Sequence, residues 1–132
     1  MAEGVLYLDS SAIVKLVFSE PETKALLYLL RAWPERVSSV VAGIEVERVA
    51  RRIGGGAIRR ARTVLSRIGL VELDDEVVKT AAALEPHTLR TLDAIHLATA
   101  LSLGRYLGAV CVYDQRLGSA ATSKAIEVLS PS

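Results

Sequence analysis

The sequence predicts an α/β fold in which a parallel β-sheet is covered by helices on both faces. Short apolar runs that suit buried strands alternate with segments that suit helices, and this alternation is typical of parallel sheets. The chain has 132 residues, of which 51% are hydrophobic, so it can build its own core and is too apolar for disorder. Because no linker, repeat or low-complexity stretch interrupts the alternation, we expect residues 1–132 to form one domain.

The first part of the chain is predicted to form two strands with two helices between them. The apolar run at 5–8 predicts a strand, and the serines at its end can cap a helix that continues to Val17. Pro21 suits the first turn of a second helix, which ends at Leu30. A brief strand is expected from Val37.

The central segment is a predicted helical hairpin over residues 40–68. Its first helix carries apolar residues at helical spacing and stops at Gly54–Gly56, and residues 57–68 form the second. Seven arginines and no acid lie between Arg48 and Arg67, although the whole chain has a net charge of only +1. The remainder of the chain is therefore strongly acidic, and this separation of charge bears on binding partners rather than on the fold.

The C-terminal half continues the alternation of strands and helices. Thr91 can cap the longest helix of this half. The expected elements, in order, are a strand at 71–73, a helix from 74, a helix at 92–103, a strand at 109–113, a helix at 117–123 and a strand at 126–129.

Composition excludes several classes of protein. No apolar run approaches the ~18 residues that cross a bilayer, so no membrane association is expected. The segment Met1–Gly4 is acidic rather than basic, which argues against a signal peptide and favours the cytoplasm. Cys111 is the single cysteine, so an internal disulfide and a cysteine zinc cluster are excluded, and we expect it to be a small buried residue.

Acidic residues at the ends of predicted strands are the candidate functional groups. Asp9 and Asp114 each follow an apolar strand, and in a parallel sheet both would lie at the carboxyl edge, where such folds place their sites. Asp93 lies in the first turn of a helix, where a carboxylate also suits the helix dipole. Glu45 and Glu47 flank the apolar stripe of the third helix, and periodicity alone does not say which of them faces the edge.

Several carboxylates at one edge repel each other unless a cation lies between them. Mg²⁺ and Mn²⁺ prefer oxygen ligands, and such an ion can activate water and stabilise charge on a phosphate. The arginine-rich hairpin could then hold a phosphate backbone beside the metal. The residues thus favour a metal-dependent reaction on a nucleic acid.

Four motifs resemble those of the PIN domains, and among them the VapC-type toxin ribonucleases of toxin–antitoxin systems. They occur in order along nearly the whole chain, at Leu8–Ala12, Ser39–Glu45, Leu92–Ala100 and Tyr113–Leu117. The resemblance implies a three-layer α/β/α fold, endonucleolytic cleavage of RNA, homodimerisation and inhibition by a cognate antitoxin. It also implies an acidic quartet around Mg²⁺ or Mn²⁺, consisting of Asp9, Glu45, Asp93 and Asp114, and so selects Glu45 over Glu47.

Other residues have supporting roles or depart from the family pattern. Ser11 lies in the first motif and can orient Asp9 or a metal-bound water, or simply cap its helix. His96 is expected to pack or to form a structural hydrogen bond rather than act as a general base. Many members carry Thr or Ser where this chain has Val112, so one orienting hydroxyl is missing. No acid follows Asp114 before Glu127, so a fifth ligand there is not expected.

The arginines of the hairpin are the expected contacts for RNA or for the antitoxin. These candidates are Arg48, Arg51, Arg52, Arg59 and Arg60. The alternative function is a non-catalytic interaction module that binds a protein or RNA through the same arginines. A phosphoryl-transfer enzyme with an aspartyl nucleophile is disfavoured, because the second aspartate usual in such enzymes is replaced by Ser11.

Overall fold

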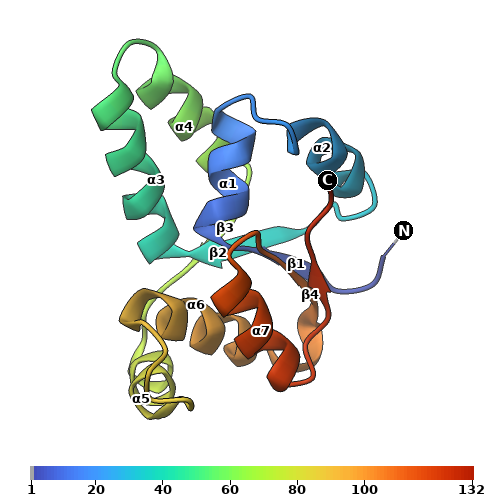
Figure 1. Ribbon diagram of the computed structural model, residues 1–132, viewed down its shortest axis with the longest axis vertical. Helices are drawn as coiled ribbons and strands as arrows, with labels where there is room; N and C mark the ends of the chain where they lie inside the picture. Colours follow the sequence, from blue (N-terminus) through green and yellow to red (C-terminus); the bar gives the residue numbers. More distant parts are fainter. Residues whose placement is uncertain (1) are drawn as a thin grey trace.

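The computed structural model describes residues 2–132 and contains a five-stranded, entirely parallel sheet with the strand order β3-β2-β1-β4-β5 (Figure 1). The strands are β1 (Val5–Leu8), β2 (Arg36–Ser39), β3 (Gly69–Val71), β4 (Leu107–Cys111) and β5 (Val128–Leu129). The helices are α1 (Ser10–Val17), α2 (Thr23–Leu30), α3 (Val40–Ile53), α4 (Ala57–Leu65), α5 (Asp75–Ala83), α6 (Thr91–Ser102) and α7 (Gln115–Ser123), with a short 3₁₀ helix at Gly104–Tyr106.

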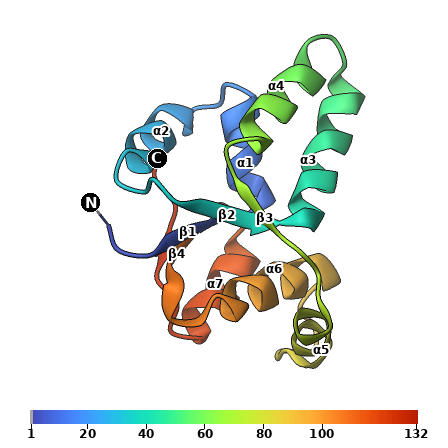
Figure 2. The same ribbon diagram turned by 180° about the vertical axis from the view of Figure 1, so that it is seen from behind.

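Alternate side chains of the central strands divide the core into two layers. Leu6 and Leu8 of β1 pack with apolar residues of α1 to α4, whereas Tyr7 packs with α6 and α7 on the other face. Figures 1 and 2 show the same separation, with α1, α3 and α4 on one side of the sheet and α6 and α7 on the other. The expected three-layer α/β/α architecture is therefore confirmed.

Most predicted elements are present, but several boundaries were wrong. Strand β3 is Gly69–Val71 rather than 71–73, because Gly69 pairs with Val37 of β2 and α4 already ends at Leu65. Helix α2 starts at Thr23, so Pro21 lies in the turn before it and not in its first turn. Thr91 is the first residue of α6 rather than its cap.

The loops after β1 and β4 lead directly into helices at the carboxyl edge of the sheet. Asp9 follows β1 and caps α1, with its side chain accepting a hydrogen bond from the backbone N–H of Ser11. Asp114 follows β4 and caps α7 in the same way, accepting from the N–H groups of Arg116 and Leu117. Because β1 and β4 are adjacent and parallel, the two predicted acids that follow them lie at the same edge of the sheet.

The remaining expectations from composition concern Cys111 and membrane spans. Cys111 is fully buried in β4, as predicted, and burial raises the pKa of its thiol to about 12, with the charge of Asp9 adding to the effect. Within residues 2–132, no helix has both the length and the apolar character needed to span a bilayer.

Substitution of two glycines by alanine, one in β4 and one in α7, should have opposite effects on stability. A Cβ at Gly108 would overlap the indole ring of Trp33 and the carbonyl oxygen of Glu3, so Gly108→Ala should lower the free energy of unfolding by about 1–3 kcal/mol. Gly118, inside α7, has room for a methyl group, so Gly118→Ala should raise it by up to about 1 kcal/mol. Urea unfolding of both variants measures the difference, and equal effects would contradict the packing of β4.

Candidate functional site

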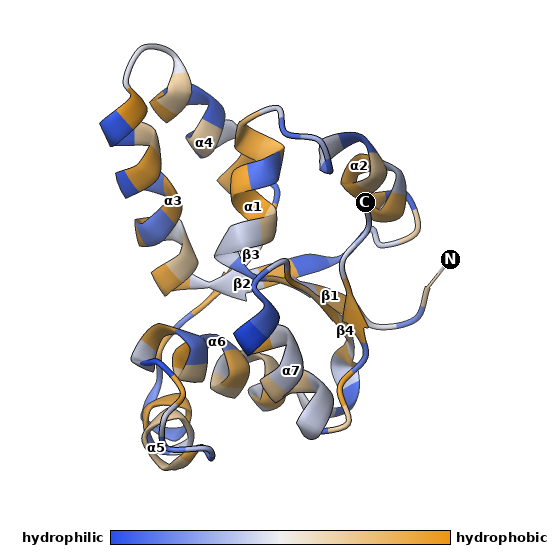
Figure 3. Ribbon diagram, in the orientation of Figure 1, coloured by the Kyte–Doolittle hydropathy of each residue, from blue (hydrophilic) through white to orange (hydrophobic). Residues whose placement is uncertain are grey.

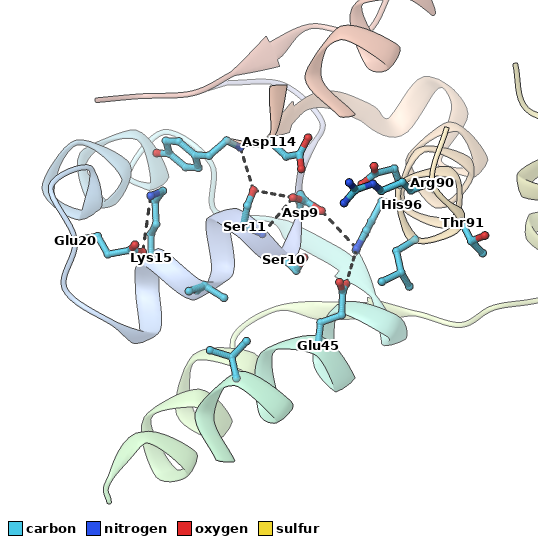
Figure 4. Close-up of a pocket in the computed structure, with 15 residues that line it drawn as sticks. Asp9, Ser10, Ser11, Lys15, Glu20, Glu45, Arg90, Thr91, His96 and Asp114 are labelled. Carbon is cyan, nitrogen blue, oxygen red and sulfur yellow. Dashed lines mark hydrogen bonds and ion pairs between the residues drawn. The ribbon is translucent and has the colours of Figure 1, made fainter. Parts of the chain in front are cut away.

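A pocket of about 720 Å³ opens at the carboxyl edge of the sheet, and acidic residues from four separate elements line it (Figure 4). All four members of the predicted quartet are among them: Asp9, Glu45, Asp93 and Asp114. Glu20 adds a further carboxylate, while Lys15 and Arg90 contribute the positive charges. We call this cavity the acidic pocket.

Asp9 is held rigidly by the helix that it caps. Its carboxylate is nearly buried, and Oδ2 accepts hydrogen bonds from the backbone N–H of Ser11 at 3.1 Å and from the Ser11 hydroxyl at 2.7 Å. The same hydroxyl oxygen accepts the N–H of Tyr113 at 3.0 Å. Ser11 therefore orients Asp9 and ties it to the loop after β4, which carries Asp114.

Glu45 is positioned by a chain of hydrogen bonds that begins in the core. The ring of His96 is almost fully buried, and its Nε2 lies 2.8 Å from Oε1 of Glu45 and 3.4 Å from Oδ1 of Asp9. On the opposite side of the ring, Nδ1 lies 2.7 Å from the hydroxyl of Tyr7. His96 therefore forms a structural hydrogen bond, as expected, and it links the carboxylates of two different elements.

The donors and acceptors in this chain follow from the chemistry of the partners. Carboxylates only accept, so Nε2 of His96 carries the proton and donates to Glu45. Burial and the charge of Asp9 raise the pKa of Tyr7 far above its ordinary value, so the phenol keeps its proton and can donate to Nδ1 of neutral His96. Burial lowers the pKa of His96, but the hydrogen bond to Glu45 and the nearby carboxylates outweigh burial and leave the pKa raised.

Asp93 and Asp114 complete the acidic side of the pocket. Asp93 lies in the first turn of α6, and burial, followed by the charges of Asp114 and Asp9, raises the pKa of its carboxyl. Asp114 is exposed, and its Oδ1 accepts from the N–H of Arg116 at 2.8 Å. The charges of Asp9 and Asp114 therefore both act on the carboxyl of Asp93.

The pocket offers the oxygen ligands that a hard cation prefers, but these ligands do not form a preassembled metal site. Within residues 2–132, no three His, Cys, Asp or Glu side chains converge closely enough to form a ready-made metal site. The available ligands are nonetheless carboxylate oxygens, which Mg²⁺ and Mn²⁺ prefer. Burial first, and then the charges of Asp114 and Asp9, raise the pKa of Asp93 by more than His96 and Arg90 lower it. The residues present therefore fit such a cation.

The structure separates Glu45 from Glu47, which periodicity left open. Glu45 lines the acidic pocket, whereas Glu47 forms ion pairs with Arg51 at 3.4 Å and with Arg62 at 3.3 Å. These pairs join α3 to α4 and hold the pKa of Glu47 below its ordinary value, the hydrogen bond from Arg62 being the main cause. Glu47 is thus part of the hairpin and not of the pocket.

The predicted arginines differ in how free they are to bind a partner. Arg51 is paired with Glu47, and Arg60 donates to the carbonyl oxygen of Val17 and lies 5.6 Å from the ring of Phe18. Within residues 2–132, no ion pair engages the exposed Arg48, Arg52 and Arg59. Figure 3 shows that both helices of the hairpin, α3 and α4, carry hydrophilic positions.

Sequence reasoning missed three residues in or next to the pocket. Tyr7 stands in an otherwise aliphatic strand, and that single polar group was the available signal for its hydrogen bond to His96. Lys15 is paired with Glu22 at 3.0 Å and lies over the ring of Tyr113, so it braces the rim. Arg90 lines the pocket although no motif marked it.

The missing hydroxyl at position 112 proves to have little bearing on the pocket. Val112 is buried in the core layer formed with α6 and α7, and it does not line the acidic pocket. The contact that ties the loop after β4 to Asp9 is supplied by Ser11 instead.

Comparison with known proteins identifies the family of this chain. The family model of the PIN domain matches residues 6–121, and the chain belongs to this family. The chain is 47% identical over 129 residues to a Mycobacterium tuberculosis protein named Ribonuclease VapC46, covering 98% of this chain and 99% of the relative. It is 38% identical to Ribonuclease VapC47 of the same species, covering 96% and 97%.

A solved structure supports the fold independently. A chain of a toxin–antitoxin complex from Klebsiella pneumoniae superposes with a TM-score of 0.73 at 23% sequence identity. The match covers 97% of this chain and 98% of the other. At this level of identity the likeness concerns the fold.

The buried hydrogen bond of Tyr7 predicts a selective loss of stability. Tyr7→Phe leaves Nδ1 of buried His96 without its partner, so the free energy of unfolding should fall by about 1–3 kcal/mol. The matched control is Tyr28→Phe on the exposed side of α2, which should change it by less than about 0.5 kcal/mol. Chemical denaturation measures both values, and equal losses would show that the Tyr7–His96 contact contributes nothing specific.

Proposed function

We propose that this protein is a metal-dependent endoribonuclease and the toxin of a VapC-type toxin–antitoxin pair. The observation that carries the proposal is the placement of four carboxylates, distant in sequence, around one pocket of a PIN-domain chain. Relatives with near-complete coverage are named ribonucleases, which supports RNA as the substrate. The chain would act as a single domain over residues 1–132, and we expect it to act in the cytoplasm.

Asp9, Glu45, Asp93 and Asp114 are the residues that would hold Mg²⁺ or Mn²⁺. When bound, such an ion supplies an activated water and neutralises charge that develops on the scissile phosphate. The protein's own contribution is to fix the acids: Ser11 orients Asp9, and His96 holds Glu45. Fixed ligands reduce the reorganisation that binding and reaction require.

The unpaired arginines of the hairpin would contact the partners. Arg48 follows Glu45 by about one helical turn on α3, and from there it could hold a phosphate of the RNA. Arg52 and Arg59 are also exposed and could bind either the RNA or a cognate antitoxin. Homodimerisation is expected from the family resemblance.

Replacement of one acid should abolish cleavage without harming the fold. Asp93→Asn removes a carboxylate ligand while keeping the size of the side chain, so RNA cleavage with Mg²⁺ or Mn²⁺ should fall by at least about a hundredfold. Asp75→Asn, in the first turn of α5 and outside the pocket, is the control and should cleave as the wild type does. Unchanged cleavage by Asp93→Asn would rule out the quartet, and an inactive wild type would favour a non-catalytic interaction module.

Metal binding should also be visible without any substrate. Added Mn²⁺ should raise the Tm of the wild type, because a ligand that binds only the folded state stabilises it. The same addition should have little effect on Asp93→Asn. The metal-free Tm of this variant should equal or exceed that of the wild type, because the partly buried charge beside Asp114 and Asp9 is gone. Calorimetry or a dye-based melt measures both, and identical shifts in the two proteins would place the cation elsewhere.

A further inference from the structure

A second cleft adjoins the acidic pocket between the loop that precedes α6 and helix α7. It has a volume of about 760 Å³, and we call it the α7 cleft. Arg90 lines both cavities, so they meet at this residue. Since α7 covers the face of the sheet opposite to α3 and α4 (Figure 1), the α7 cleft lies on the far side of the acidic pocket from the arginine-rich hairpin.

The charge of the α7 cleft is opposite to that of the acidic pocket. Its lining contains two guanidinium groups, Arg90 and Arg116, and no carboxylate. Among residues 2–132, neither arginine takes part in an ion pair. Thr88, Gln115 and Ser119 add uncharged hydrogen-bond donors. A cleft with this lining favours an anionic ligand that also offers hydroxyl groups.

We propose that the α7 cleft binds the RNA backbone directly beside the scissile phosphate, with Arg90 and Arg116 contacting phosphodiester groups. This inference rests on the proposed ribonuclease function. Planar guanidinium groups suit phosphate oxygens, and the hydroxyl and amide groups of the lining can bind phosphate or the ribose 2′-hydroxyl. A strand held by the hairpin on one side and by the α7 cleft on the other would cross the acidic pocket between them.

RNA suits the α7 cleft better than an acidic peptide does. Its apolar lining is limited to Pro86, Leu89 and the buried Ala120, so it lacks the large exposed aromatic or aliphatic side chains that anchor peptides. Its continuity with the acidic pocket also matches a chain of regularly spaced phosphates, one of which lies at the acids.

Binding of a short, unstructured, fluorescein-labelled single-stranded RNA tests the proposal. The measurement uses the full-length protein carrying Asp93→Asn, so that the RNA stays intact and the effect of Arg90 on Asp93 no longer matters. Added Arg116→Ala or Arg90→Ala should each weaken binding by about fivefold to tenfold, and Ser119→Asp should weaken it by charge repulsion. Each arginine removed should also reduce the slope of log affinity against log salt concentration by about 0.7.

The control is Arg105→Ala, an exposed arginine outside both cavities whose guanidinium lies 5.2 Å from the ring of Tyr106. It should bind RNA as the parent protein does. If the Arg116 and Arg90 variants match this control while wild-type protein still cleaves RNA, the α7 cleft proposal is wrong and the ribonuclease function stands. If wild-type protein neither binds nor cleaves RNA, both fail. Tighter binding of a polyglutamate peptide than of RNA at this cleft would also overturn the proposal.

Discussion

Repulsion among carboxylates at one edge of the sheet is the constraint that the surrounding structure must accommodate. Helix dipoles and local hydrogen bonds offset this repulsion, and few basic side chains take part. Asp9 and Asp114 cap helices, and Asp93 lies in a first helical turn, so each faces the positive end of a helix dipole. Ser11 donates a hydrogen bond to Asp9, which follows β1, and His96 donates one to Glu45 of α3. Burial, followed by the charges of Asp114 and Asp9, still raises the pKa of Asp93, and a bound cation would relieve this cost.

The parallel sheet explains why acids so far apart in sequence share one pocket. Strands β1 and β4 are neighbours in the sheet, so the loops after them lie side by side and bring Asp9 near Asp114. The helices that follow β2 and precede β4 supply the other two acids from opposite faces of the sheet. The buried Tyr7–His96–Glu45 chain then runs from one core layer across the edge to α3, which couples the packing of the core to the geometry of the pocket.

The alternation of apolar runs was sufficient to predict the parallel sheet and its two covering layers, because burial on both faces leaves a strong signal in the sequence. It did not predict the boundaries of β3, which depend on pairing with β2 and therefore on tertiary contacts. Helical periodicity left Glu45 and Glu47 equivalent, and only the resemblance to PIN domains chose between them. The sequence did not predict that Arg90 lines the pocket, because its position depends on how the loop before α6 folds beside α7.

Diffraction from crystals grown with Mn²⁺, recorded for its anomalous signal, shows whether the acids bind a cation. We expect one or more strong peaks inside the acidic pocket, within coordination distance of carboxylate oxygens from Asp9 and Asp93. Well-ordered crystals with Mn²⁺ present and no peak in this pocket, or a peak bound only by residues outside it, would show that the acids do not form the metal site.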